Sequence, residues 1–224
     1  MNAHTFVLHD SAKNPDADIW FAEPPGFIGL PLDALSPPQG SPPPGDRAEL
    51  AVLLDSAPDD KCRQLLLGQL GEGLRLLEAL REVGTVHCSL GLHRDDVEEG
   101  GEGQTLLSLL ALSWRAIATA PPAVTAARAV TSQAPPHTRI EYLEDLPCGP
   151  ATLSETLRTP AAGDGLVRQA LLQVHAHLPH PDGKRLAVLT LSTTAVSRRE
   201  AYRRMLRQLA GMVSFENPLT PGEA

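Results

Sequence analysis

Hydrophobic and polar residues alternate most clearly at 85–93. The stretch TVHCSLGLH places its apolar residues on one side and its polar residues on the other, a period of two that is typical of a half-buried β-strand. An acidic, glycine-rich loop follows at 94–103, and the apolar pattern of 104–117 predicts a returning strand. We expect the two strands to form a β-hairpin.

The same reasoning predicts four more strands in the second half of the chain. The segments 139–146 and 151–158 are separated by the turn sequence LPCGP, and 166–178 and 185–193 are joined by PHPDGK, which contains the turn signal Asp-Gly. Near the N-terminus, paired prolines limit the apolar residues to short extended pieces.

Two segments carry a helical pattern instead. Within 46–83, the capping box DRAE begins a short helical turn that Pro58 ends. A longer helix restarts at Asp59 or Asp60 and runs to about Val83, with leucines three and four positions apart, and Gly84 is a suitable residue to end it. A second helix follows Ser197, in the capping box SRRE, with an apolar stripe that includes Tyr202, Leu206 and Leu209. Clustered hairpins with helices beside them favour an α+β fold, an antiparallel sheet with helices packed on it.

Length and low-complexity segments suggest how the chain is divided. The 224 residues fit a single α+β domain, 1–224. Within it, 36–46 (SPPQGSPPPGD) is expected to be a proline-rich loop or linker, and 216–224 a flexible tail.

Composition restricts the classes of function. The net charge of −8 argues against nucleic-acid binding, which requires a basic surface. No apolar run approaches the roughly 18 residues of a membrane span, and the N-terminus does not resemble a signal peptide. Three scattered cysteines indicate free thiols, and the excess of arginine over lysine is typical of a bacterial genome. We therefore expect a cytoplasmic protein.

Both ends of the chain resemble the Mog1/PsbP-like group. The N-terminal part contributes EPPGFIGLPL at 23–32, and the C-terminal part LTLSTTAVSRREAYRRMLRQLAGMVSFE at 189–216. The resemblance implies a sheet between helices and a binding or adaptor role, because that group is largely non-catalytic. The residues that carry it in the terminal helix and strand end are Tyr202, Met205, Met212, Val213, Ser214 and Phe215.

Histidines are the main candidates for chemistry. On a strand, His175 and His177 point to the same side, as a His-x-His metal pair does. No acidic third ligand lies at a fixed spacing, so solvated polar residues are the preferred interpretation, and neither a metal nor another cofactor is expected. His87 lies on the polar side of its own strand and would join them if the two strands were neighbours.

Other chemistry has weaker support. No GxSxG motif occurs, and Cys88 lies on the apolar side of its strand, where thiols are usually inert. Arg203 and Arg207 lie opposite the apolar stripe of the last helix, on a face that is solvated or that could bind an acidic partner.

These patterns predict a protein that is not an enzyme. We expect a non-catalytic adaptor, chaperone or assembly factor that binds another protein through His87, His175, His177, Arg203 and Arg207. Two alternatives stay open: a small metal-dependent enzyme that uses the His-x-His pair, and a structural subunit that inserts 36–46 into a neighbour.

Overall fold

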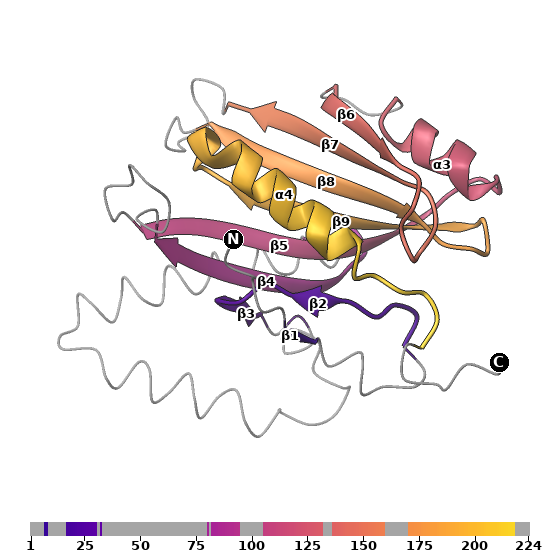
Figure 1. The fold of residues 1–224 in the computed structure, drawn as a ribbon, viewed down its shortest axis with the longest axis horizontal. Coiled ribbons are helices and arrows are strands. Elements are labelled where there is room, and N and C mark those ends of the chain that lie inside the picture. Colours follow the sequence, from indigo (N-terminus) through magenta and orange to yellow (C-terminus); the bar gives the residue numbers. More distant parts are fainter. Residues whose placement is uncertain are drawn as a thin grey trace.

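The predicted fold class is confirmed: among the described residues, seven antiparallel strands form one sheet, and two helices pack on it (Figure 1). Several predictions lie outside the described residues: those for 36–46, for the helix up to residue 79, for the acidic residues 95–102 and for the tail beyond 217. The computed structural model describes residues 7–8, 17–30, 32, 80, 82–94, 105–131, 136–159 and 170–217.

The sheet has the order β3-β4-β5-β9-β8-β7-β6. All three predicted hairpins are present, as β4/β5, β6/β7 and β8/β9. The long pairing of β5 with β9 joins the first hairpin to the last. The strands are β3 (Phe27–Gly29), β4 (Thr85–Arg94), β5 (Thr105–Ala116), β6 (Thr138–Leu143), β7 (Ala151–Arg158), β8 (Leu171–Pro179) and β9 (Arg185–Thr193).

Helix α4 (Arg199–Ala210) lies across one face of the sheet, over β8 and β9 (Figure 1). Its predicted apolar stripe is confirmed, because Tyr202, Leu206 and Leu209 are buried. They pack on the even-numbered residues of β8, which alternate toward the helix. We call this side the α4 face.

The predicted capping box at Ser197 does not form. Residues Val196–Arg198 make a short 3₁₀ turn, η4, and α4 begins only at Arg199, without a side-chain cap at its N-terminus. The sequence pattern located the helix correctly, but the tighter turn takes the place of the cap.

The N-terminal segment completes the α4 face. β2 (Ala22–Glu23) pairs with β1 (Val7–Leu8) in a separate two-stranded sheet. Just before β2, Trp20 exchanges backbone hydrogen bonds with Ser214, and the buried Phe21 joins the core beside α4. Residues far apart in sequence thus seal the same core.

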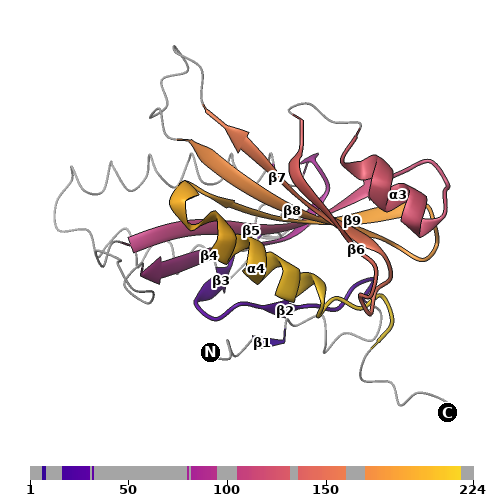
Figure 2. The same ribbon diagram turned by 45° about the horizontal axis from the view of Figure 1, so that its top comes forward.

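Helix α3 (Pro122–Ala129) covers part of the opposite face. The sequence predicted a loop with at most a helical turn at 119–136, whereas two turns of helix form after Pro121. The Thr152 hydroxyl donates to the carbonyl of Ala126 (2.8 Å), and Ala129 packs on Leu186 and Val188. Figure 2 shows α3 beside the end of the sheet where β8 and β9 join.

The predicted end of the first helix is confirmed at Gly84. Its φ of +81° is the left-handed conformation that favours glycine. A Cβ at this position would lie 2.6 Å from the carbonyl oxygen of Trp114, so the close approach to β5 also requires glycine. Among the described residues, no helix is long and apolar enough to cross a membrane.

A candidate binding groove on the sheet

The sheet face opposite α4 contains a groove of about 480 Å³, and we call this side the groove face. The groove crosses five adjacent strands, from β4 through β5, β9 and β8 to β7. Its volume lies within the usual range of ligand sites. Lining residues with side chains on this face include Leu80, Val83, Thr85, Leu107, Leu109, Ser113, Arg115, His137, Thr156, Arg158, Gln173, His175, Thr190 and Ser192.

The floor of the groove is a hydrogen-bonded row of polar side chains. Nδ1 of His175 lies 3.1 Å from the Thr190 hydroxyl, and its Nε2 lies 3.2 Å from the Thr156 hydroxyl. Beside it, the amide of Gln173 donates to the Ser192 hydroxyl (3.2 Å). Cross-strand partners hold each group, so the floor is organised before any ligand arrives.

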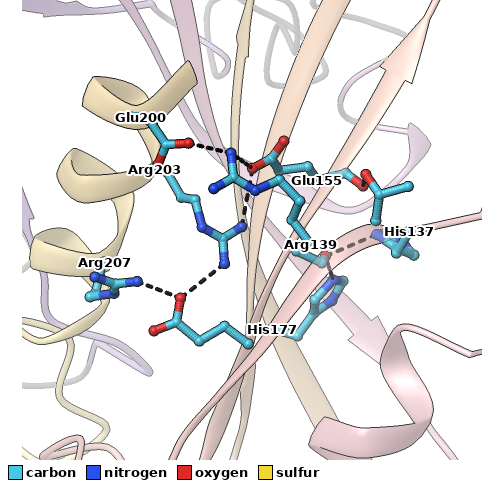
Figure 3. A network of polar contacts seen from close by, with 10 residues as sticks. His137, Arg139, Glu155, His177, Glu200, Arg203 and Arg207 are labelled. Atoms are coloured by element: carbon cyan, nitrogen blue, oxygen red, sulfur yellow. Dashed lines mark hydrogen bonds and ion pairs between the residues drawn. The ribbon is translucent and has the colours of Figure 1, made fainter. Parts of the chain in front are cut away.

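Three imidazole rings gather at the β7 side of this floor. The ring centroids of His137, His175 and His177 are 5.2–5.9 Å apart. The Ser154 hydroxyl lies between two of them, 2.9 Å from Nδ1 of His137 and 3.3 Å from Nε2 of His177 (Figure 3). Chemically, the cluster is a set of neutral donors and acceptors.

The histidines are uncharged at neutral pH. Burial is the main reason that the pKa values of His175 and His177 fall from 6.5 to about 3, and neighbouring imidazoles and Arg115 lower them further. Burial and Arg115 also lower the pKa of His137. A general base for neutral pH needs a pKa near 7, so His175 and His177 are poorly suited to that role.

The expectation of a solvated His-x-His pair is therefore wrong in part. The two histidines do share the groove face, but His177 is only 1% exposed because α3 covers its end of the sheet. Its Nδ1 has no hydrogen-bond partner within the described part of the chain. Replacing His177 should thus affect folding, unlike replacement of an outward strand residue.

His87 does not join this cluster. Two strands, β5 and β9, separate β4 from β8, and His87 lies opposite Leu112, on the α4 face. There its ring packs edge-on against Phe21, and its Nε2 is 2.7 Å from Glu23. The sequence predicted that this side of β4 is polar and open, but it faces the core because the N-terminal segment covers it. A surface shared by His87, His175 and His177 does not exist.

Arg203 and Arg207 also lie away from the groove. Arg203 is buried on the α4 face, 3.3 Å from Glu155 and 2.9 Å from Glu141, and Arg207 also pairs with Glu141 (Figure 3). Hydrogen bonds from both arginines lower the pKa of Glu141 against the opposing effect of burial. The expected solvated arginine face is wrong for Arg203, which ties α4 to β6 and β7.

A bulge in edge strand β6 connects the two faces. Thr138 lies opposite Glu155 and Glu141 opposite Leu153, so β6 contains one extra residue at this point. Arg139 sits in the bulge with a φ of +47° and pairs with Glu155 and Glu200 on the α4 side.

The bulge also explains why sequence reasoning missed His137. In a regular strand, His137 and Arg139 would point to the same side. Instead His137 contacts the histidines of the groove face while Arg139 reaches α4 (Figure 3). No local pattern marks a bulge in this sequence, so only the tertiary structure adds His137 to the site.

The described thiols are not activated. Burial raises the pKa of Cys88 and of Cys148 from 9.0 to about 11, so both are protonated at neutral pH and poor nucleophiles. Within the described ranges, no group of three or more His, Cys, Asp or Glu side chains is arranged to hold a metal ion. The His-x-His pair therefore has no complete ligand set there.

The charge of the groove contrasts with that of the chain. Arg115 and Arg158 line it, and none of its described lining residues is acidic, although the chain carries 27 Asp and Glu residues. Both arginines lower the pKa of His175, which lies between them. The groove is thus electropositive within an acidic protein.

Comparison with models of known families, with curated proteins and with solved structures found no significant match. The resemblance to the Mog1/PsbP-like group stays a prediction.

Proposed function

We propose that this protein is a non-catalytic adaptor, chaperone or assembly factor that holds a segment of another protein in the sheet groove. The observation that carries the proposal is the pairing of a hydrogen-bonded polar floor with exposed apolar residues around it. Leu107 is 52% exposed and Val83 62% exposed. Apolar side chains together with a few organised polar groups are typical of concave binding sites.

The length of the groove favours a segment of polypeptide as its occupant. Five neighbouring strands span about 19 Å, four steps of about 4.8 Å. An extended peptide of about six residues has the same length. Neutral histidines and protonated thiols in the described residues support binding in preference to catalysis.

Arg203 and Arg207 are not part of this proposal. Their guanidinium groups are engaged with Glu141 and Glu155 on the other face, and releasing Arg203 would remove one of the two arginines that pair with the buried carboxylate of Glu155. Of the predicted partner surface, the proposal therefore keeps the sheet face of His175 and leaves out the arginine face.

A displayed library of random dodecapeptides tests the proposal with the full chain. We expect enriched peptides whose binding falls at least tenfold in Ser192→Trp, which fills the groove, and falls in Leu107→Glu, which changes an exposed residue of its lining. Val124→Trp, on the exposed side of α3 and outside the groove lining, is the matched control and should bind normally. Circular dichroism checks that each variant folds.

Two results contradict the proposal. One is a library selection that enriches no peptide. The other is a set of enriched peptides that bind the folded Leu107→Glu and Ser192→Trp variants as tightly as the parent.

A further inference from the structure

The sign and placement of charge in the groove indicate the chemistry of its occupant. Arg115 and Arg158 have no ion-pair partner within the described residues, whereas Arg139, Arg203 and Arg207 on the α4 face are all paired with glutamates. Arginine presents several donors in a planar fork that matches a carboxylate. Two such groups in one groove are suited to an anionic ligand.

The register places the two arginines apart along the strands. Arg115 lies opposite Leu186 at the hairpin end of β9, and Arg158 lies opposite Leu171 at the start of β8. Both still act on the same imidazole, His175. An occupant that contacts both must therefore extend across the groove floor, which a single small anion does not do.

Between the arginines, the floor offers polar but uncharged groups. Gln173, Ser192 and Thr190 are hydrogen-bonded to neighbours, so they can be covered without leaving a charge buried. Leu107 and Leu109 add apolar contact on the β5 side. Acidic side chains at the ends and apolar ones between them would match these surfaces.

We propose that the segment bound in the groove is an acidic peptide, whose carboxylates pair with Arg115 and Arg158 while its apolar side chains contact the leucines of β5. This inference rests on the proposed function and specifies the partner's chemistry. The chain's net charge of −8 makes the preference selective, because acidic peptides are repelled elsewhere on the molecule.

Two synthetic probes test the preference: a labelled hexapeptide with Glu at both ends and Leu between them, and the same peptide with Gln in place of Glu. In fluorescence anisotropy with the full chain, we expect the Glu peptide to bind at least tenfold more tightly than the Gln peptide. The reason is that hydrogen bonds to a charged group are stronger than those between neutral groups. Arg115→Gln and Arg158→Gln should each weaken binding of the Glu peptide about tenfold, and added salt should weaken that binding further.

Arg204→Gln is the matched control, because it removes the same charge from an exposed position on α4. It should change binding of the Glu peptide less than twofold. An equal loss in this control would mean that bulk charge, and not the groove, decides binding, and would overturn the inference.

Three other outcomes also overturn it: no binding of the Glu peptide, equal binding of the Glu and Gln peptides, and a free tricarboxylate that displaces the Glu peptide at equal concentration. The last would indicate a small-anion site. None of these results affects the proposed function if the peptide library still yields binders that require Ser192 and Leu107. Loss of those binders contradicts the proposed function itself.

Discussion

On β8, successive residues serve two different surfaces. Leu172, Val174 and Ala176 face α4 in a fully buried apolar core, whereas Gln173 and His175 form the polar floor of the groove. The difference shows that one strand can supply stability on one side and recognition on the other, because its side chains alternate with a period of two.

The charges of the two faces differ in the same way. On the α4 face, Arg203 is satisfied by Glu155 and Glu141 within the fold. On the groove face, Arg115 and Arg158 have no such carboxylate among the described residues. Arginines paired within the chain hold elements together, whereas arginines without an internal partner can bind one from outside.

The largest expected loss of stability comes from breaking the ion pair between Arg203 and Glu155 on the α4 face. Arg203→Met leaves the buried Glu155 with the longer contact to Arg139, and Glu155→Leu leaves the buried Arg203 with Glu141. Each loses one partner of a buried charge, so each should lower the free energy of unfolding by up to about 3–5 kcal/mol in urea titrations. The double variant should recover most of this loss. Arg204→Ala, exposed on the same helix, should cost less than about 0.5 kcal/mol. If both single variants match that control, the pair does not hold α4 in place.

Next in size is the apolar contact of α4. Leu206 and Leu209 are 0% and 1% exposed against β8, so truncation of either to alanine should cost about 2–5 kcal/mol and leave a cavity. Peptide binding in the groove should persist in folded samples, because these leucines lie on the other side of the sheet. Thermal unfolding midpoints equal to the parent's would show that α4 docks through a different face.

The smallest expected effect is a pH dependence of the free energy of unfolding, which arises from two histidines of the groove face. His175 and His177 have folded pKa values of about 3 against 6.5 when exposed, so their stabilising effect is complete above pH 6.5 and is lost as pH falls toward 3. We expect unfolding free energy to drop by roughly 1 kcal/mol per histidine between pH 6.5 and 5.5. His175→Gln with His177→Gln should flatten this slope, and an unchanged slope would place its origin elsewhere.

Local periodicity predicted much of the fold. The three hairpins and the stripe of Tyr202, Leu206 and Leu209 follow from strand and helix periods and from turn residues such as Asp182-Gly183. His175 and His177 were found for the same reason, since alternation alone places them on one side of β8.

The rest depended on contacts between residues far apart in the chain. A strand's period reveals that it has two faces but not which element covers each, so His87 was assigned to an open surface that Phe21 covers. The burial of His177 under α3 and of Arg203 against Glu155 required the packing of separate segments.

The amino-acid sequence by itself determined the elements, the hairpins and the alternation that separates apolar from polar residues on β8, because all of these arise from neighbours along the chain. Only the tertiary structure decided that β9 pairs with β5, that a bulge turns His137 toward His175, and that Arg115 and Arg158 share one groove. The physical reason is that strand order and the covering of each face depend on the total burial and hydrogen bonding of the assembled chain, which no local pattern records.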